Sequence, residues 1–307
     1  MLAYLKLIRI PNLTIVAILQ AVLYFGILKP VFVAFGIGTV LNENYFVLFI
    51  LTTLILTAAG YIINDILDVK ADEINKPGKY VVGKDISEKK AYIYYIVMLI
   101  TGLAISFIIA IHINKIHYII IYLIAVALLY LYSKYFKKQF LCGNIFVSIF
   151  SAFVPGIILV FEFPGLVSLY KTDYSSFEFV MDIFIGFMAF SFFVSFYREL
   201  VKDMEDIEGD IIIKAKTFPV VLGIEMTKLL SGIISIIILI LLFYWLKMDI
   251  NYDKNYLKIY VLLFVVIPLF YSVFLLKKAE TKFDFNKLSK VIKVIMVSGI
   301  SILFFYL

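Results

Sequence analysis

Nine long runs of apolar residues, separated by short polar segments, dominate the chain. A helix needs about 20 mostly apolar residues to cross a bilayer, with a range of roughly 17–25. The sixth and ninth runs each contain a charged residue, Asp182 and Lys293. Residues 30–42 are apolar but too short to cross again, so we expect them to extend the first helix beyond Pro30 or to lie at the membrane interface. The pattern predicts nine transmembrane helices, at residues 10–28, 45–63, 91–111, 117–133, 140–161, 179–197, 218–246, 257–276 and 290–307.

The composition agrees with this pattern. Of the 307 residues, 64% are hydrophobic and 16% are charged, whereas a soluble domain has roughly 45–50% apolar and about 25% charged residues. The single cysteine, Cys142, excludes an intramolecular disulfide and a multi-cysteine metal site. We therefore expect an all-α integral membrane protein that forms one domain over residues 1–307.

The positive charges predict the orientation of the chain in the membrane, because Lys and Arg concentrate in cytoplasmic loops. If the N-terminus is cytoplasmic, 21 of the 28 Lys and Arg residues lie in cytoplasmic segments and 6 in external ones. This places the C-terminus outside. The net charge of +6 then reflects membrane topology, and no nucleic-acid partner is expected.

Acidic residues concentrate in two of the cytoplasmic segments. Residues 65–88 hold six of the 22 Asp and Glu residues, and residues 199–210 hold six more. Acidic residues contribute little to topology, so this clustering needs another explanation. We predict two cytoplasmic cap segments, near 64–90 and 198–216, as the place for any chemistry.

Each acidic segment places oxygen ligands on one face of a helix. Successive helical residues turn by about 100°, so Asn64, Asp68 and Asp72 share a face, and Asp65 points about 100° away. In the second segment, a narrow stripe is formed by Glu199, Asp203, Asp206 and Asp210.

Such rows could be ordinary solvated helix ends. Like charges four residues apart destabilise a helix, however, and here they recur on the same predicted membrane face. Oxygen ligands favour Mg²⁺, which proteins usually hold with a few carboxylates and substrate phosphates. The pattern indicates a diphosphate substrate with an apolar tail.

The two rows resemble the signatures of a known family. The pattern Asn-Asp-x-x-Asp-x-x-x-Asp at 64–72 resembles the first signature of the UbiA superfamily of intramembrane prenyltransferases, and Asp203, Asp206 and Asp210 resemble the second. The span count and the position of each signature, after the second and sixth helices, also agree with that family. The resemblance covers the whole chain.

The resemblance implies a bundle around a central cavity that opens at the cytoplasmic face. It implies prenyl transfer from an isoprenyl diphosphate with two Mg²⁺ ions. Asn64 and Asp68 would bind one ion, with Asp72 close by. Asp206 and Asp210 would bind the other, and Asp203 would support them. The residues expected to act in catalysis are Asp68, Asp72, Asp206 and Asp210.

Basic residues would complete the diphosphate site. Lys79 stands where the family's first loop usually has Arg, and Tyr80 where it has Pro. The segment 132–138 resembles the family's fourth-loop segment and is followed by Asn144. The residues expected to bind substrate are Arg9, Asn12, Lys79, Lys137, Lys138, Asn144, Arg198 and Lys202, with the last two near a second anionic group.

The run 197–223 is most similar to the archaeal members that build ether lipids. Those members transfer geranylgeranyl from geranylgeranyl diphosphate to geranylgeranylglyceryl phosphate. The acceptor would then be a lipid-like molecule that carries a phosphate, met among membrane lipids in the cell membrane. Members that prenylate aromatic or quinone-precursor acceptors share both signatures, so they remain an alternative. A secondary transporter is the non-enzyme alternative, although its charges would lie nearer the bilayer midplane.

Overall fold

The computed structural model describes residues 2–75, 77–248 and 255–306, and within them the regular structure is helical. In this part of the chain, nine helices are long and apolar enough to cross a membrane. The predicted number of spans is therefore confirmed. The spans are Ile10–Ala34, Glu43–Leu67, Glu88–His112, Ile116–Lys138, Cys142–Phe161, Tyr174–Glu205, Phe218–Lys247, Asn255–Lys278 and Lys282–Phe305.

The helices follow one another through short connections. The α-helices of the first half are α1 (Leu2–Leu7), α2 (Ile10–Ala21), α3 (Lys29–Ala34), α4 (Glu43–Leu67), α5 (Val69–Asn75), α6 (Glu88–His112), α7 (Ile119–Lys134) and α8 (Cys142–Phe161). Those of the second half are α9 (Phe163–Thr172), α10 (Tyr174–Glu205), α11 (Ile207–Ile212), α12 (Phe218–Met248), α13 (Asn255–Val261), α14 (Ile267–Lys278) and α15 (Lys282–Ser301). The π and 3₁₀ segments are η1 (Val22–Leu28), η2 (Ile116–Tyr118), η3 (Phe136–Lys138), η5 (Leu262–Val266) and η6 (Ile302–Phe305).

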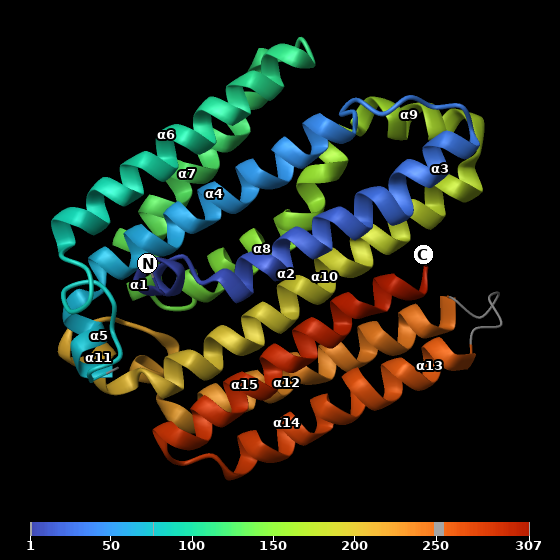
Figure 1. The fold of residues 1–307 in the computed structure, drawn as a ribbon. Coiled ribbons are helices and arrows are strands. Elements are labelled where there is room, and N and C mark those ends of the chain that lie inside the picture. The colour runs from blue at the N-terminus through green and yellow to red at the C-terminus, as the bar shows by residue number, and fades with distance from the viewer. Residues whose placement is uncertain (1, 76, 249–254, 307) are drawn as a thin grey trace.

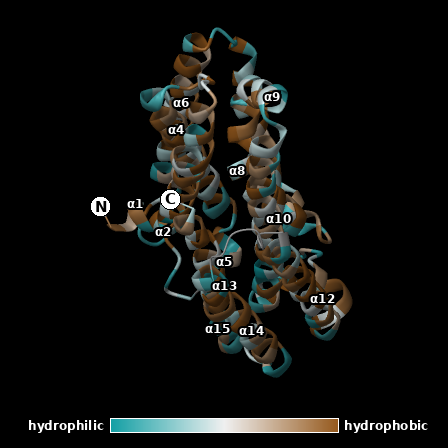
Figure 2. Cartoon of the chain, turned by 90° about the vertical axis from the view of Figure 1, so that its right-hand side faces the viewer, coloured by the Kyte–Doolittle hydropathy of each residue, from teal (hydrophilic) through white to brown (hydrophobic). Residues whose placement is uncertain are grey.

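The long helices pack side by side in one bundle (Figure 1). Helix α4 packs against α6 and α7, and α10 packs against α8, α12 and α15. Helix α2 joins the two groups through its contacts with α4 and α8. Hydrophobic residues cover much of the helix length, and hydrophilic residues gather near the helix ends (Figure 2).

The short helices α5 and α11 lie together at one end of the bundle (Figure 1). We call this the polar end. The C-terminus lies at the opposite end, as an odd number of spans requires.

The first span continues through Pro30, so of the two expectations for 30–42 the helical extension holds up to Ala34. Proline removes one helical hydrogen bond and its ring clashes with the preceding turn. Here the π segment η1 directly precedes Pro30, and the π segment η5 precedes Pro268 in the same way. A wider turn before each proline lets the helix pass it without ending.

Helix α10 is longer than the sixth predicted span. Its 32 residues extend for about 48 Å at 1.5 Å per residue, whereas the hydrocarbon core is about 30 Å thick. Residues 198–205 of the expected second cap segment are therefore the end of α10, and only α11 with the following loop is a separate cap. The helix end carries the second acidic row toward the polar end.

Glu162 holds in place residues 35–42, which connect the first two spans at the end of the bundle opposite the polar end. Its buried carboxylate accepts hydrogen bonds from the backbone N–H groups of Val40 (2.8 Å) and Leu41 (2.9 Å). The Tyr24 hydroxyl donates to the Leu41 carbonyl, and the Tyr24 ring stacks on Phe46. These contacts tie α8 to the link between the first two spans.

Replacing Glu162 with alanine should therefore lower thermal stability. Each hydrogen bond to a charged acceptor contributes about 1.5–3 kcal/mol, so the unfolding midpoint should fall by roughly 5 °C or more. Glu162→Gln keeps one acceptor oxygen and should lose less. A thermal melt in detergent, with exposed Glu178→Ala as the control, measures the difference. Equal midpoints for Glu162→Ala and the control would contradict this role.

Candidate active site

The first acidic row runs from the end of α4, where Asn64 and Asp68 form a pair, to Asp72 in the first turn of α5. The Asn64 amide donates to Asp68 (2.9 Å), and Lys137 donates to the Asn64 oxygen (3.2 Å) and forms an ion pair with Asp68. Asp72 interacts electrostatically with the same lysine. The structure thus brings three predicted ligands and one predicted phosphate contact together.

Asp65 points away from this group, as the helical geometry predicts. Its carboxylate accepts a hydrogen bond from Arg9 (2.7 Å), and the Arg9 guanidinium lies 4.7 Å from the centre of the Tyr61 ring. Arg9 adopts a left-handed backbone conformation (φ 54°) between α1 and α2. The end of α4 therefore separates the first acidic row from the Arg9 pair.

The second acidic row passes from the end of α10 into α11. Asn144 of α8 donates to Asp203 (2.7 Å), and the Thr217 hydroxyl donates to Asp210 (3.0 Å). Asp206 ends α10, and the chain turns there into α11. The predicted stripe thus spans two helices, and Asn144 contacts the acidic row directly.

A buried contact between α5 and α11 joins the two cap segments. Asn75, only 6% exposed, accepts a hydrogen bond from the Gly209 N–H (3.0 Å). A Cβ added at Gly209 would lie 2.3 Å from the Asn75 amide nitrogen. A backbone hydrogen bond from Lys216 to the Lys138 carbonyl (2.8 Å) links the second cap segment to the turn that carries Lys137. These contacts hold the two acidic rows at the same end of the bundle.

The two rows are close enough to affect each other's charge. The pKa of Asp210 is raised to about 6, chiefly by burial and also by the nearby carboxylates of Asp206 and Asp68, while the hydrogen bond from Thr217 and the charge of Lys137 oppose the shift. Carboxylates that repel one another in this way favour a bound cation. Asp68 of the first row therefore lies close enough to Asp210 of the second row to affect its charge.

The donor set suits magnesium that is shared with a substrate. In the described residues, no group of three or more His, Cys, Asp or Glu side chains is placed to hold one ion. Mg²⁺ usually binds one or two carboxylates and completes its octahedron with water and phosphate oxygens. Pairs such as Asn64 with Asp68, and Asp206 with Asp210, fit that pattern.

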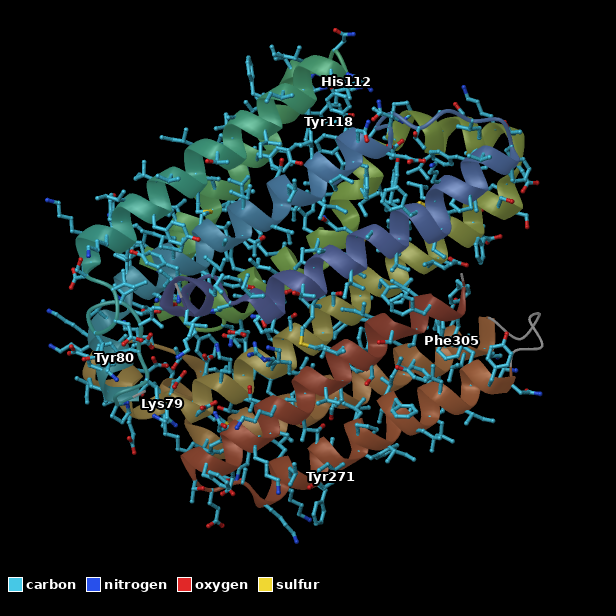
Figure 3. The ribbon with its side chains drawn as sticks, viewed as in Figure 1. Lys79, Tyr80, His112, Tyr118, Tyr271 and Phe305 are labelled. Atoms are coloured by element: carbon cyan, nitrogen blue, oxygen red, sulfur yellow. The ribbon has the colours of Figure 1, made fainter. Side chains whose placement is uncertain are left out.

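The other predicted substrate contacts divide into two places. Lys79 is exposed and lies beside Tyr80 at the polar end, while His112 and Tyr118 lie at the opposite end (Figure 3). Lys138 is half-buried in the turn that also carries Lys137. Others lie on α2 and α10. On α10, the carboxylate of Glu199 forms ion pairs with Arg198 (N to O, 3.1 Å) and with Lys202 (N to O, 3.9 Å). On α2, the side-chain oxygen of Asn12 accepts a hydrogen bond from Lys293 (2.8 Å).

Several residues at this end were not predicted from the sequence. Tyr132 is half-buried on α7 and interacts electrostatically with carboxylates of both rows, Asp68 and Asp203. Asn75 and Thr217 are common polar residues with no distinguishing pattern. Lys293 could have been recognised from the sequence as a candidate site residue, because it is a charged residue within an apolar run.

Comparison with known proteins identifies the family. The model of the UbiA prenyltransferase family matches residues 14–294, which include both acidic rows. The chain belongs to the UbiA prenyltransferase family. It is therefore related to multi-pass membrane proteins, and the resemblance inferred from the two signatures is confirmed.

Curated UbiA relatives include archaeal digeranylgeranylglyceryl phosphate synthases. The protein of Sulfurisphaera tokodaii is 33% identical over 182 residues, which span 59% of this chain and 59% of the relative. That of Sulfolobus acidocaldarius is 32% identical over 233 residues, 76% of this chain and 74% of the relative.

Two solved structures have the same fold. A structure of digeranylgeranylglyceryl phosphate synthase matches with a TM-score of 0.59 and 25% identity, over 97% of this chain and 96% of that chain. A UbiA homolog from Archaeoglobus fulgidus, bound to GPP and Mg²⁺, matches with a TM-score of 0.55 and 18% identity, over 98% and 99%. The UbiA fold therefore extends over nearly the whole chain.

Proposed function

We propose that this protein transfers a geranylgeranyl group from geranylgeranyl diphosphate to geranylgeranylglyceryl phosphate and releases diphosphate. The observation that carries the proposal is the pair of facing acidic rows, with Lys137 between Asn64 and Asp68, at one end of an apolar bundle. Relatives named as digeranylgeranylglyceryl phosphate synthases support the choice of donor and acceptor.

Magnesium would be held by the two rows. Asn64 and Asp68 would provide one set of oxygen ligands, with Asp72 beside them, and Asp206 and Asp210 the other, with Asp203 in support. Two ions bound there would neutralise the diphosphate as its bond to the prenyl group breaks. A homologous structure bound to Mg²⁺ and a prenyl diphosphate supports this assignment.

The protein's own residues would bind and orient the two substrates. The C1–O bond of the donor breaks and its electron pair leaves with the diphosphate, where Lys137 stabilises the negative charge. The acceptor hydroxyl oxygen forms the new C–O bond, and its proton passes to the released diphosphate. The apolar helices exclude water from the allylic cation. Lys138 and the exposed Lys79 would bind the outer phosphate.

The polar end would face the cytoplasm. Of the 28 Lys and Arg residues, 21 lie in segments on that side under this arrangement, as expected for cytoplasmic loops. The N-terminus would then be cytoplasmic and the C-terminus external. A cysteine-labelling scan of residue 80 against residue 118 would test this, and labelling of residue 118 alone from the cytoplasm would contradict it.

A panel of acceptors tests the proposed function directly. Purified protein with Mg²⁺ and labelled geranylgeranyl diphosphate should prenylate geranylgeranylglyceryl phosphate and leave 4-hydroxybenzoate unmodified. Prenylation of the aromatic acid alone would overturn the proposed acceptor while keeping prenyl transfer. Loss of the diphosphate group without any transfer would overturn prenyl transfer itself.

A further inference from the structure

A second basic cluster lies at the polar end, apart from Lys137. Its members come from three long helices and the residue before α2. They are Arg9, Asn12, Arg198, Lys202 and Lys293. Lys293 on α15 donates to Asn12 on α2 (2.8 Å), and the charges that act on it are those of Arg198 and Arg9. The cluster therefore joins the first, sixth and ninth spans.

Lys293 forms its side-chain hydrogen bond with the neutral Asn12, and the charges that affect it most are those of the cations Arg198 and Arg9. Within the part of the chain that the structure describes, no ion pair connects Lys293 to a carboxylate. A lysine within a membrane span is costly, and such residues usually face the bundle interior and mark a substrate path. The arrangement at Lys293 is unfavourable unless an anion binds there.

Arg198 provides a second, independent indication that an anion binds here. Its Nη1 donates to Glu199 (3.1 Å), but its Nε is buried and has no hydrogen-bond partner among the described residues. A buried donor without a partner costs about 1–3 kcal/mol, and more when charged. A ligand oxygen at this point would remove that cost.

The charge of the cluster matches one phosphate monoester. Asp65 pairs with Arg9, and Glu199 balances one of the two cations beside it, Arg198 or Lys202. The charge of Lys293 and that of the cation not balanced by Glu199 remain without a carboxylate, so the cluster carries about two net positive charges. A phosphate monoester carries about −1.5 to −2 at neutral pH.

The cluster is adjacent to the donor site but distinct from it. Asp65 and Asn64 are neighbours that point about 100° apart on α4, with Arg9 on one side and Lys137 on the other. Two anionic groups could therefore bind on different sides of the end of α4.

We propose that Lys293, Arg198 and Asn12 form the binding site for the phosphate of the acceptor. The inference rests on the proposed function and adds the residues that select a phosphate-bearing acceptor over a neutral one. Asn12 orients Lys293 through its side-chain oxygen, and its amide NH₂ group can donate to a phosphate oxygen. Glu199 and Asp65 hold the arginines in place.

Steady-state kinetics of Lys293→Met test the inference. The KM for geranylgeranylglyceryl phosphate should rise about 10- to 100-fold, while the KM for geranylgeranyl diphosphate changes less than twofold. The penalty should be much smaller with geranylgeranylglycerol, which lacks the phosphate. Lys293→Arg keeps the charge and should recover part of the loss. The matched control is Lys290→Met, an exposed lysine one turn earlier on α15.

Binding gives a readout that does not depend on turnover. Glycerol phosphate should compete with the acceptor in the wild type and bind at least about tenfold more weakly to Lys293→Met in calorimetry. An equal rise in KM for both substrates, or an equal loss with both acceptors, would overturn the phosphate site. These outcomes can be distinguished from a failure of the proposed function, because in that case the wild type itself would not prenylate geranylgeranylglyceryl phosphate.

Discussion

Replacing Asp68 with alanine should lower prenyl transfer by at least about 10²–10³-fold, the usual effect of removing one group that stabilises charge in a transition state. Asp68 contacts both Lys137 and Asn64 at the end of α4, so its loss would remove a proposed magnesium ligand and the ion-pair partner of the lysine. Asp206→Ala should have an effect of similar size from the second row. The measurement is diphosphate release with both substrates at saturation.

The control for this prediction is Glu73→Ala, which removes an exposed carboxylate from the neighbouring helix α5. It should keep activity within about twofold, because a solvated surface charge contributes little. Asp68→Asn preserves the shape of the side chain and should also be inactive if the charge matters. Near-normal rates for Asp68→Ala and Asp206→Ala would show that the acidic rows do not bind the metal.

Replacing Gly209 with alanine should reduce activity about 10²-fold, although glycine has no side chain that could bind the substrate. The added Cβ would lie 2.3 Å from the Asn75 amide, so α11 must shift away from α5. A displacement of about 1 Å at a reacting centre costs about 10²-fold, and Asp210 is the next residue along. Alanine is otherwise more favourable in a helix than glycine by about 1 kcal/mol, so a loss of activity would have to come from the clash with Asn75.

Two further variants separate this contact from a general loss of folding. Gly232→Ala in α12 has open space around the new Cβ and should leave activity unchanged. Asn75→Ala removes the obstructing side chain, so Gly209→Ala should add little to it, and a double-mutant cycle measures this coupling. Additive losses in the cycle would contradict the direct contact.

The spans were predictable because composition and length determine them. An apolar run of about 20 residues has few alternatives to a membrane helix, and nine such runs gave nine spans among the described residues. The ends of the helices were harder to predict. Residues 198–205 continue α10, since Arg, Lys and Glu form helix about as readily as Leu.

The site was predictable where spacing along one helix determines contacts. The Asn64–Asp68 pair follows from a separation of four residues. Contacts between distant segments do not follow from spacing. Asn75 meets Gly209 across 134 positions, and Lys293 meets Asn12 across 281. Those contacts depend on how the helices pack, which no local pattern encodes.

The central claim is that the two acidic rows act together on one diphosphate through magnesium. Calorimetric binding of geranylgeranyl thiodiphosphate, a donor analogue that resists cleavage, tests it most directly. The wild type should bind the analogue with Mg²⁺ and lose most of that affinity in EDTA, and Asp68→Ala and Asp206→Ala should each bind it at least about tenfold more weakly. Equal affinity with and without Mg²⁺, or wild-type affinity in both variants, would contradict the account.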